Sequence, residues 1–461
     1  MKKILSFVLV LVMILSVVSL TACGKKKTGA EVVASTADFS VTQGMFAYFY
    51  KVTYSSYESY LEGLGVDTNV SLKQQECPYV LKGDKTWFTY FVEMTKDYVS
   101  EILALCQEAY EAGVTLDDED IKSIDSYMTE INNAAKNYGA GIDEYVSLVV
   151  KNPFTGVDLR KCLEMEALAA KYSDEFYNTI DLSDDKIEEY YQANKAYYDT
   201  VDLYAFTVAA DAEDIDYVRD AIAKLQSAED GEEFLRLIRE YIEADYIRNG
   251  REIDEAVQAT IEDYLYSCEF RGVSTSDFNT KTTSDWAKNA KVGETYLEES
   301  DESFTVYFII REMSRDESLK RNVRIAFFSA ETYKNDTIPQ KVYKVWEESG
   351  FTEEKFIELN KEHSQDEDTR ETGGLYTNIG YGDYVKEFND WLFAEERTAG
   401  DHGLVETSLG WHLVYYVGEN EIAQWESDVI TEYADEMYNK MIDEYYYSLV
   451  YDDAVIAEID A

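Results

Sequence analysis

The chain has 461 residues, of which 46% are hydrophobic, and its formal net charge is −50 at pH 7. This length predicts about two to four domains rather than one core. Binding to nucleic acids and other polyanions requires clustered Lys and Arg, so the charge excludes those partners.

Residues 1–22 have the layout of a secretory signal peptide: a positively charged start, an apolar run and then small residues. The run is short for an uncleaved membrane helix, which is the alternative. The ending LTAC (20–23) resembles the bacterial lipobox, in which the cysteine becomes the lipidated N-terminus. We therefore expect Cys23 to carry a lipid, residues 23–39 to form a linker, and the protein to be anchored at the outer face of the bacterial cell membrane.

Four further cysteines are widely spaced and contain no Cys-x-x-Cys, so no zinc or thioredoxin-like pattern exists. They are Cys77, Cys106, Cys162 and Cys268. Two disulfides and buried free thiols both remain open, and free thiols are the simpler alternative. The chain also lacks phosphate-binding glycine loops, the Gly-x-Ser-x-Gly elbow and His-Glu-x-x-His, so we expect neither a cofactor nor a metal.

Residues 40–199 are predicted to form a helical domain. The stretch 86–113 repeats apolar residues every three or four positions and stops at Gly113. We expect the next helix to begin with Thr115 as its N-cap and a later one to be opened by Ser183.

Beyond residue 200, short apolar strands alternate with helices, and the pattern repeats. The segment 201–208 is similar to 323–330, and a Trp, a Gly and a closing strand recur in the same order in both copies. The repeat predicts two tandem α+β modules, at 200–315 and 320–420.

The last segment, 421–461, contains a helical pattern over 425–460 that we expect to form one long helix. A single helix cannot bury its own apolar face, so it is predicted to pack on the N-terminal helices. The helical domain would then be discontinuous in sequence.

The second module carries the motifs of a known family. FIELNKEHSQD (356–366) places a Phe, a Leu, and a Ser followed two residues later by an Asp at the family's positions. TGG (372–374), GDYVKEF (382–388) and TSLGWHLVYY (407–416) follow in the family's order. The module therefore resembles a parvulin-type (PpiC) peptidyl-prolyl isomerase.

With the lipobox, the helical region and the terminal helix, the whole chain resembles a PrsA/SurA-like extracytoplasmic foldase lipoprotein. The fold class implied is α+β multidomain. A chaperone-like α-helical domain, built from N-terminal helices and the C-terminal helix, accompanies a degenerate parvulin-like module and a peptidyl-prolyl isomerase module.

The resemblance implies a hydrogen-bond network beneath a proline pocket. His412 and Thr407 fall on the family's second-histidine and threonine positions, and Asp366 on its Asp or Cys position. The pocket positions are taken by Phe388, by Tyr384 where Met is usual, and by Tyr376 where Leu is usual.

One position departs from the family. Aligning VRIAFF with the family's R-H-I-L-V strand puts Arg324 where a histidine pairs with the closing one, and an arginine cannot share a proton with an imidazole. We expect Arg324 either to pair with Asp366 or to extend outward and leave the site inactive. In the first module Leu203 and Thr305 take the two histidine positions, so we expect that module not to be catalytic.

The function implied is to bind unfolded or partly folded exported proteins and to accelerate cis/trans isomerisation of their Xaa-Pro bonds. The alternative is a non-catalytic holdase with a degenerate site. A third hypothesis, a solute-binding lipoprotein, requires a cleft between two lobes, which the repeats do not favour. The 39 tyrosines either pack between helices or line a client surface, and His363 and His402 are expected at exposed loops or helix ends.

Overall fold

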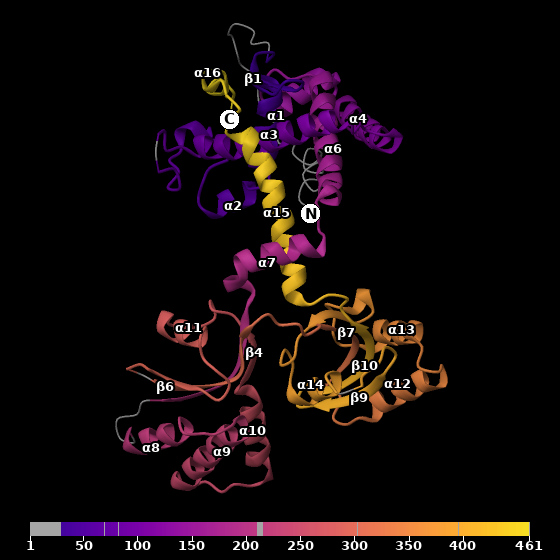
Figure 1. The fold of residues 1–461 in the computed structure, drawn as a ribbon. Helices are drawn as coiled ribbons and strands as arrows, with labels where there is room; N and C mark the ends of the chain where they lie inside the picture. Colours follow the sequence, from indigo (N-terminus) through magenta and orange to yellow (C-terminus); the bar gives the residue numbers. More distant parts are fainter. Residues whose placement is uncertain are drawn as a thin grey trace. The chain divides into compact units, whose positions relative to one another are not determined.

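The structure is a computed structural model that describes residues 29–460 except 69, 82, 210–214, 302 and 395. The predicted signal peptide (1–22) and Cys23 lie outside the described residues. The chain divides into a helical unit, made of residues up to Asp181 and from Tyr433 onward, and a two-sheet unit, Leu182–Glu432. Figure 1 shows the element order. None of the described helices is both long enough and apolar enough to span a bilayer.

The helical unit combines a short hairpin with helices. Its elements are β1 (Val32–Ser35), β2 (Ser40–Thr42), α1 (Gln43–Ser55), α2 (Glu58–Gly63), η2 (Leu72–Gln74), α3 (Trp87–Ala112), α4 (Asp118–Tyr138), α5 (Ile142–Val150), α6 (Gly156–Thr179), the end of α15 (Gln424–Tyr446) and α16 (Asp453–Ile456). Helix α3 ends where predicted, because Gly113 adopts the left-handed conformation with φ 75° that closes a helix C-terminus.

Two details of this unit differ from the prediction. Part of the expected linker is the strand β1, which pairs antiparallel with β2. Helix α4 is capped by Asp117 rather than Thr115. Asp117 accepts the backbone N–H of Asp120, and the Asp120 carboxylate accepts the N–H of Asp117 in return, so this capping box satisfies two backbone donors at once.

The C-terminal segment closes the helical unit, as predicted, but as two helices rather than one. Helix α15 ends at Tyr446, and α16 follows after a break. Tyr438 on α15 donates to Glu101 Oε1 at 2.6 Å, and Ile456 and Ile459 are buried in the same core as α1 and α3. The helical domain is therefore discontinuous in sequence.

Tyrosine hydroxyls in this unit donate hydrogen bonds to carboxylates. Glu166 of α6 is buried and accepts the hydroxyls of Tyr48 (3.2 Å) and Tyr98 (3.0 Å), which belong to α1 and α3. Burial raises the pKa of Glu166 to about 7, although both hydroxyls act to lower it. These rings favour the packing alternative for the tyrosines of the unit's core.

The four cysteines of the described residues are free and buried, so the free-thiol alternative is confirmed for them. They are Cys77, Cys106, Cys162 and Cys268. The first three belong to the core of the helical unit.

The two-sheet unit begins with a helix that the sequence assigned to the helical domain. Helix α7 (Asp184–Tyr198) follows Ser183, as predicted, but packs with the two-sheet unit. One of its contacts is the tilted packing of the Tyr191 ring against Trp425, with ring centroids 5.1 Å apart.

Two modules follow α7. The first contains β3 (Thr200–Ala209), α8 (Ile215–Leu225), α9 (Gly231–Arg248), α10 (Glu255–Ser267), β4 (Glu269–Val273), α11 (Lys281–Ala287), β5 (Thr295–Glu299) and β6 (Ser303–Ser314). The second contains β7 (Arg321–Ser329), α12 (Thr337–Glu348), α13 (Glu353–His363), η3 (Arg370–Thr372), β8 (Leu375–Ile379), α14 (Lys386–Leu392), β9 (His402–Thr407) and β10 (Gly410–Glu419).

The two sheets have the same topology. Their strand orders are β4-β3-β6-β5 and β8-β7-β10-β9, and all pairs are antiparallel. The α+β multidomain class and the tandem repeat predicted from the sequence are thus confirmed.

The pairing of the strands shows that the sequence alignment of β3 with β7 is wrong by two residues. In the second sheet His412 pairs with Phe327, and in the first sheet Thr305 pairs with Thr207. The predicted match of 201–208 with 323–330 is therefore out of register. Leu203 pairs with Ile309 and is not a partner of Thr305, so the pair of histidine positions expected in the first module is wrong.

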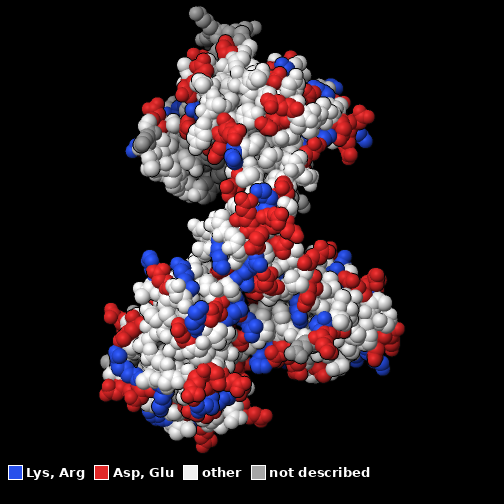
Figure 2. Space-filling model, in the orientation of Figure 1, with Lys and Arg blue, Asp and Glu red and all other residues white. Residues whose placement is uncertain are grey.

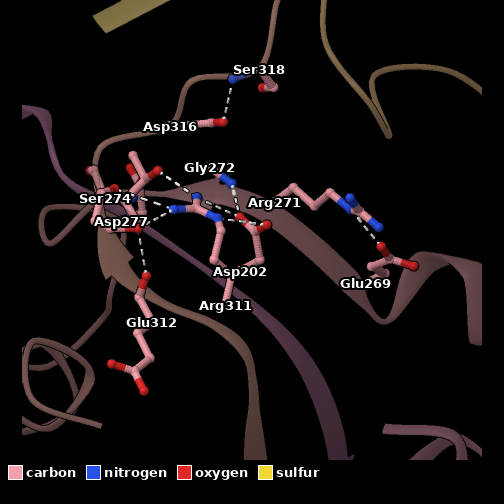
Figure 3. A network of polar contacts seen from close by, with 12 residues as sticks. Asp202, Glu269, Arg271, Gly272, Ser274, Asp277, Arg311, Glu312, Asp316 and Ser318 are labelled. Atoms are coloured by element: carbon pink, nitrogen blue, oxygen red, sulfur yellow. Dashed lines mark hydrogen bonds and ion pairs between the residues drawn. The ribbon is translucent and has the colours of Figure 1, made fainter. Parts of the chain in front are cut away.

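One end of the first sheet is held by a polar network (Figure 3). Arg311 of β6 forms two parallel hydrogen bonds of 2.8 and 2.9 Å to Asp202 of β3, which also accepts the N–H of Gly272 from β4. Further guanidinium hydrogen bonds reach Thr200 and Ser314. The network joins three strands where the β3–β6 register shifts. Because its charged groups are paired and hydrogen-bonded to one another, we assign it a structural role in holding these strands together.

Candidate active site

Two apolar layers cover opposite faces of the second sheet, and the alternation along β7 decides which residues reach each layer. Val323 and Ile325 pack with Phe388 of α14 on one face. Ala326 and Phe328 pack with Trp346 of α12 on the other. The face covered by α14 also carries His412.

His412 lies between two phenylalanine rings. Phe327 of β7 stacks on the imidazole at 5.0 Å with an interplanar angle of 30°. Phe388 of α14 meets it edge-on at 6.1 Å. Gly410 makes this register possible, since a side chain there would collide with the carbonyl oxygen of Phe328, and its φ is 142°.

Two tyrosines extend this row of rings. The Tyr384 ring lies 5.0 Å from Phe388, and the Tyr376 ring lies 6.2 Å from Tyr384 at 89°. Phe388 is buried, whereas both tyrosines are half-buried. The row, from Phe327 through His412, Phe388 and Tyr384 to Tyr376, is called the aromatic cluster below.

His412 is held as a neutral imidazole. Burial lowers its pKa to about 4. Its Nε2 lies 3.0 Å from Thr407 Oγ1, which also donates to the carbonyl of Gly410 and accepts the N–H of Leu409. The β9–β10 turn thus fixes the orientation of the ring.

Asp366 approaches the cluster from the tyrosine end. Its Oδ2 accepts the hydroxyl of Tyr376 at 2.7 Å and that of Thr369. Burial alone would raise the pKa of Asp366, but these hydrogen bonds outweigh burial and hold the pKa below its usual value. Burial and the carboxylate together raise the pKa of Tyr376 to about 12. Asp366 is therefore ionised and Tyr376 neutral at pH 7.

The loop that carries Asp366 is tied to the sheet. Ser364, at the end of α13, accepts the backbone N–H groups of Phe327 (3.1 Å) and Asp366 (3.2 Å) through its hydroxyl. The family's Ser and Asp spacing thus has a local cause, because the serine connects the loop to β7.

Arg324 is not part of the cluster, which corrects the sequence-based assignment. It lies on the opposite face of β7, where it pairs with Glu353 at 2.7 Å and donates to the carbonyls of Thr372 and Gly373. It neither pairs with Asp366 nor extends into solvent, since its side chain is 12% exposed.

Two residues of this face were missed by sequence reasoning. Phe327 stacks on His412, and Ile325 is the neighbour of Phe327 on the same face of β7. The sequence VRIAFFS contained the information needed, because side chains alternate between the two faces of a strand. A strand that buries Val323 and Ile325 on one face places Arg324 on the other.

The other two histidines lie away from the cluster. His363 ends α13 and is half-buried, near Glu362. His402 was expected in an exposed loop or helix end. Instead it begins β9 and stacks on Phe351 at 3.7 Å. No group of three or more His, Cys, Asp or Glu within the described ranges is arranged to hold a metal ion.

Comparison with known proteins identifies the second module. The family model "Rotamase: PPIC-type PPIASE domain" matches residues 323–418. No curated protein sequence matches the chain.

Solved structures with partial likeness include peptidylprolyl isomerase (PrsA) from Bacillus anthracis, with 14% identity, covering 52% of this chain and 97% of that one at a TM-score of 0.20. PrsA from Bacillus subtilis has 12% identity, 94% coverage of both chains and a TM-score of 0.18. Foldase protein PrsA from Streptococcus pneumoniae has 11% identity, covers 90% of this chain and 93% of that one, and has a TM-score of 0.19. With TM-scores this low, these likenesses support no conclusion about architecture or function.

The matched segment begins at the first strand of the second sheet and ends in its last, so it contains every residue of the aromatic cluster. The second module is a parvulin-type (PpiC) peptidyl-prolyl isomerase domain.

Proposed function

We propose that the chain is an extracytoplasmic, membrane-anchored foldase that binds unfolded exported proteins and isomerises their Xaa-Pro bonds at the aromatic cluster. The observation that carries the catalytic half is the contact of Phe388 and Phe327 with a neutral, hydrogen-bonded His412 inside the matched domain.

The chemistry requires no nucleophile. Rotation about an Xaa-Pro bond has a barrier of roughly 20 kcal/mol because twisting breaks amide resonance. Each ~1.4 kcal/mol by which a site prefers the twisted amide over the planar one gives about a tenfold rate gain. Phe388, Tyr384 and Tyr376 would hold the proline ring away from water, where the amide loses the hydrogen bonds that favour its planar form.

The polar groups would act on the carbonyl side. The fixed negative charge of Asp366 opposes charge on the carbonyl oxygen and so favours the twisted amide, in which that oxygen is less negative. His412 and Thr407 hold the floor of the cluster rigid. Tyr376 positions Asp366 through its hydroxyl.

The remaining parts of the proposal concern clients and location. The helical unit would hold the unfolded chain, and a lipid on Cys23 would tether the protein outside the cell membrane. A bacterial lipoprotein of this kind meets its clients as they emerge unfolded, when proline isomerisation limits folding to tens of seconds.

A non-catalytic holdase is the second candidate, and one observation favours it. The His412 face of β7 presents Val323, Ile325 and Phe327, so within the described residues no second imidazole faces His412. The family's paired histidines are thus reduced to one.

A protease-coupled assay with a prolyl peptide separates the two candidates. The foldase predicts a rate above background that His412→Ala lowers. The matched control is His363→Ala, which removes an imidazole outside the cluster and leaves the rate unchanged. If wild type shows no rate above background while still suppressing aggregation of an unfolded client, the holdase is correct.

A further inference from the structure

A groove of about 510 Å³ lies in the helical unit between α3 and the end of α15. Its walls are Asp97, Tyr98, Glu101, Tyr438, Asn439, Ile442, Asp443, Tyr446 and Tyr447. None of these is a lysine or arginine. The groove therefore combines carboxylates with tyrosine rings and has no positive charge among its lining residues.

The carboxylates of the groove are not neutralised by cations. Asp443 has no ion pair or side-chain hydrogen bond among the described residues. Burial raises the pKa of Asp97, and a hydrogen bond from the Tyr446 hydroxyl offsets this only in part. The nearby Lys96 pairs with Glu93 and Asp453 instead. No lysine or arginine of the described residues pairs with Asp97 or Asp443.

The tyrosines offer ring faces next to these charges. Tyr447 is 82% exposed, and Tyr446 is 41% exposed with its ring edge-on to Tyr447 at 5.5 Å. An exposed aromatic ring beside a carboxylate is the environment in which a lysine or arginine gains both a charge contact and a cation–π contact.

We propose that this groove binds cationic segments of unfolded polypeptides, with a Lys or Arg side chain seated between Asp97 and Asp443 and packed against Tyr446 or Tyr447. The proposal rests on the client-binding half of the proposed function and names its substrate class. The charge balance of the chain supports it, since acidic residues outnumber basic ones 92 to 42. Figure 2 shows acidic residues spread over one face of the molecule. Attraction of a basic chain over this surface raises its encounter rate.

Two other occupants fit less well. A metal ion needs several converging ligands, and the described residues contain no such group. A wholly apolar segment would desolvate Asp443 without giving it a partner, which costs free energy. A cationic segment satisfies both the rings and the charges.

The test measures binding of the full chain to a short labelled peptide without proline, in which Lys alternates with Gly and Ser. The second probe replaces every Lys by Glu. Omitting proline keeps the isomerase domain out of the measurement. The variant is Asp97→Asn with Asp443→Asn, which keeps side-chain shape, and its matched control is Glu130→Gln with Glu144→Gln, which removes the same charge from exposed helix positions.

We expect the Lys peptide to bind wild type, with an affinity that falls as salt rises, and the Glu peptide not to bind. The groove variant should weaken binding about tenfold, and the control by about twofold or less. Tyr447→Ala should also weaken binding, because it removes a ring without changing charge.

Equal losses in the groove variant and its control would overturn the proposal, since they would show diffuse attraction by the whole acidic surface. No binding of the Lys peptide would overturn it as well. Prolyl isomerase activity is measured on the same samples, so that loss of peptide binding with full activity contradicts the groove, whereas absent activity with intact binding contradicts the catalytic half of the proposed function.

Discussion

The two modules share one topology and differ at the position of the site. Where the second module has Phe327, His412 and Phe388, strand pairing and the Trp-aligned helices α11 and α14 place Thr207, Thr305 and Thr283 in the first. This comparison shows that the sheet does not depend on the aromatic cluster.

The threonines of the first module satisfy one another and their neighbours. Thr207 and Thr305 are 2.9 Å apart through their hydroxyls, and Thr283 donates to Glu298, which also accepts the hydroxyl of Tyr307 at 3.1 Å. A proline ring gains little from such hydroxyls, whereas the aromatic cluster offers ring faces. This difference supports the proposed placement of the proline site in the second module.

The largest effect on activity should follow from removing the Phe388 ring, whose position in the first module is taken by a threonine. Phe388→Leu keeps the core filled but removes the ring, and we expect kcat/KM for a prolyl peptide to fall about 100-fold. Thr283→Ala, at the equivalent position of the first module, should leave kcat/KM within about twofold. A large loss from Thr283→Ala would show that the first module also takes part in catalysis.

The sequence predicted the elements correctly where an apolar repeat extends over many residues. It failed where a strand was aligned with the family in the wrong register. The apolar repeat of α3 predicted the helical unit, and the recurring Trp and Gly of the modules predicted the tandem α+β organisation. Arg324 was misassigned because a shift of one residue along a strand moves a side chain to the opposite face.

Other differences between prediction and structure arise where several residues could make the same contact, and a sequence pattern does not show which of them makes it. Asp117 replaced Thr115 as the cap because Asp120 completes a reciprocal pair. The pairing of Tyr376 with Asp366 was not predicted, since the two lie in a loop and a strand whose meeting depends on tertiary packing. The structure places His412 in contact with Thr407 and Phe388, three residues that the family resemblance had grouped.

The second-largest effect should separate stability from activity. Asp202→Asn leaves the Arg311 guanidinium without its charged partner, so we expect the first module to lose about 3 kcal/mol of unfolding free energy. The isomerase rate should not change. Chemical denaturation followed by tryptophan fluorescence and the peptide assay measure the two quantities.

Asp316→Asn is the control for that prediction, because this half-buried carboxylate lies near the network and, among the described residues, accepts the N–H of Ser318 alone (Figure 3). We expect it to change unfolding free energy by about 0.5 kcal/mol or less. A loss of isomerase activity in Asp202→Asn at temperatures where the fold persists would couple the two modules and break the comparison.

An intermediate effect is expected from restoring an imidazole on the correct face of β7. Ile325→His places a histidine on the His412 side, and we expect kcat/KM to rise about three- to tenfold if paired imidazoles speed the reaction. Arg324→His, its neighbour on the other face, should give no gain. A gain from Arg324→His alone would contradict the strand register described above.

The smallest effect concerns pH. The folded-state pKa of His412 is lowered from 6.5 to about 4, so its contribution to stability is complete above pH 6.5 and is lost as pH falls toward 4. Between pH 7 and 6 the second module should lose about 0.7 kcal/mol of unfolding free energy through this group. The slope should be absent in His412→Gln, and the first module, with Thr305 at this position, should not show it. An NMR titration that gave His412 a pKa near 6.5 would contradict its burial.

The central claim is that proline is isomerised at the aromatic cluster and not at its threonine counterpart. The direct measurement is an NMR exchange experiment on a prolyl peptide with the full chain, recorded together with protein shift changes. We predict faster cis/trans exchange and shift changes at Phe327, His412 and Phe388, with Thr207, Thr305 and Thr283 unchanged. Exchange at the uncatalysed rate, or shift changes confined to the three threonines, would contradict the account.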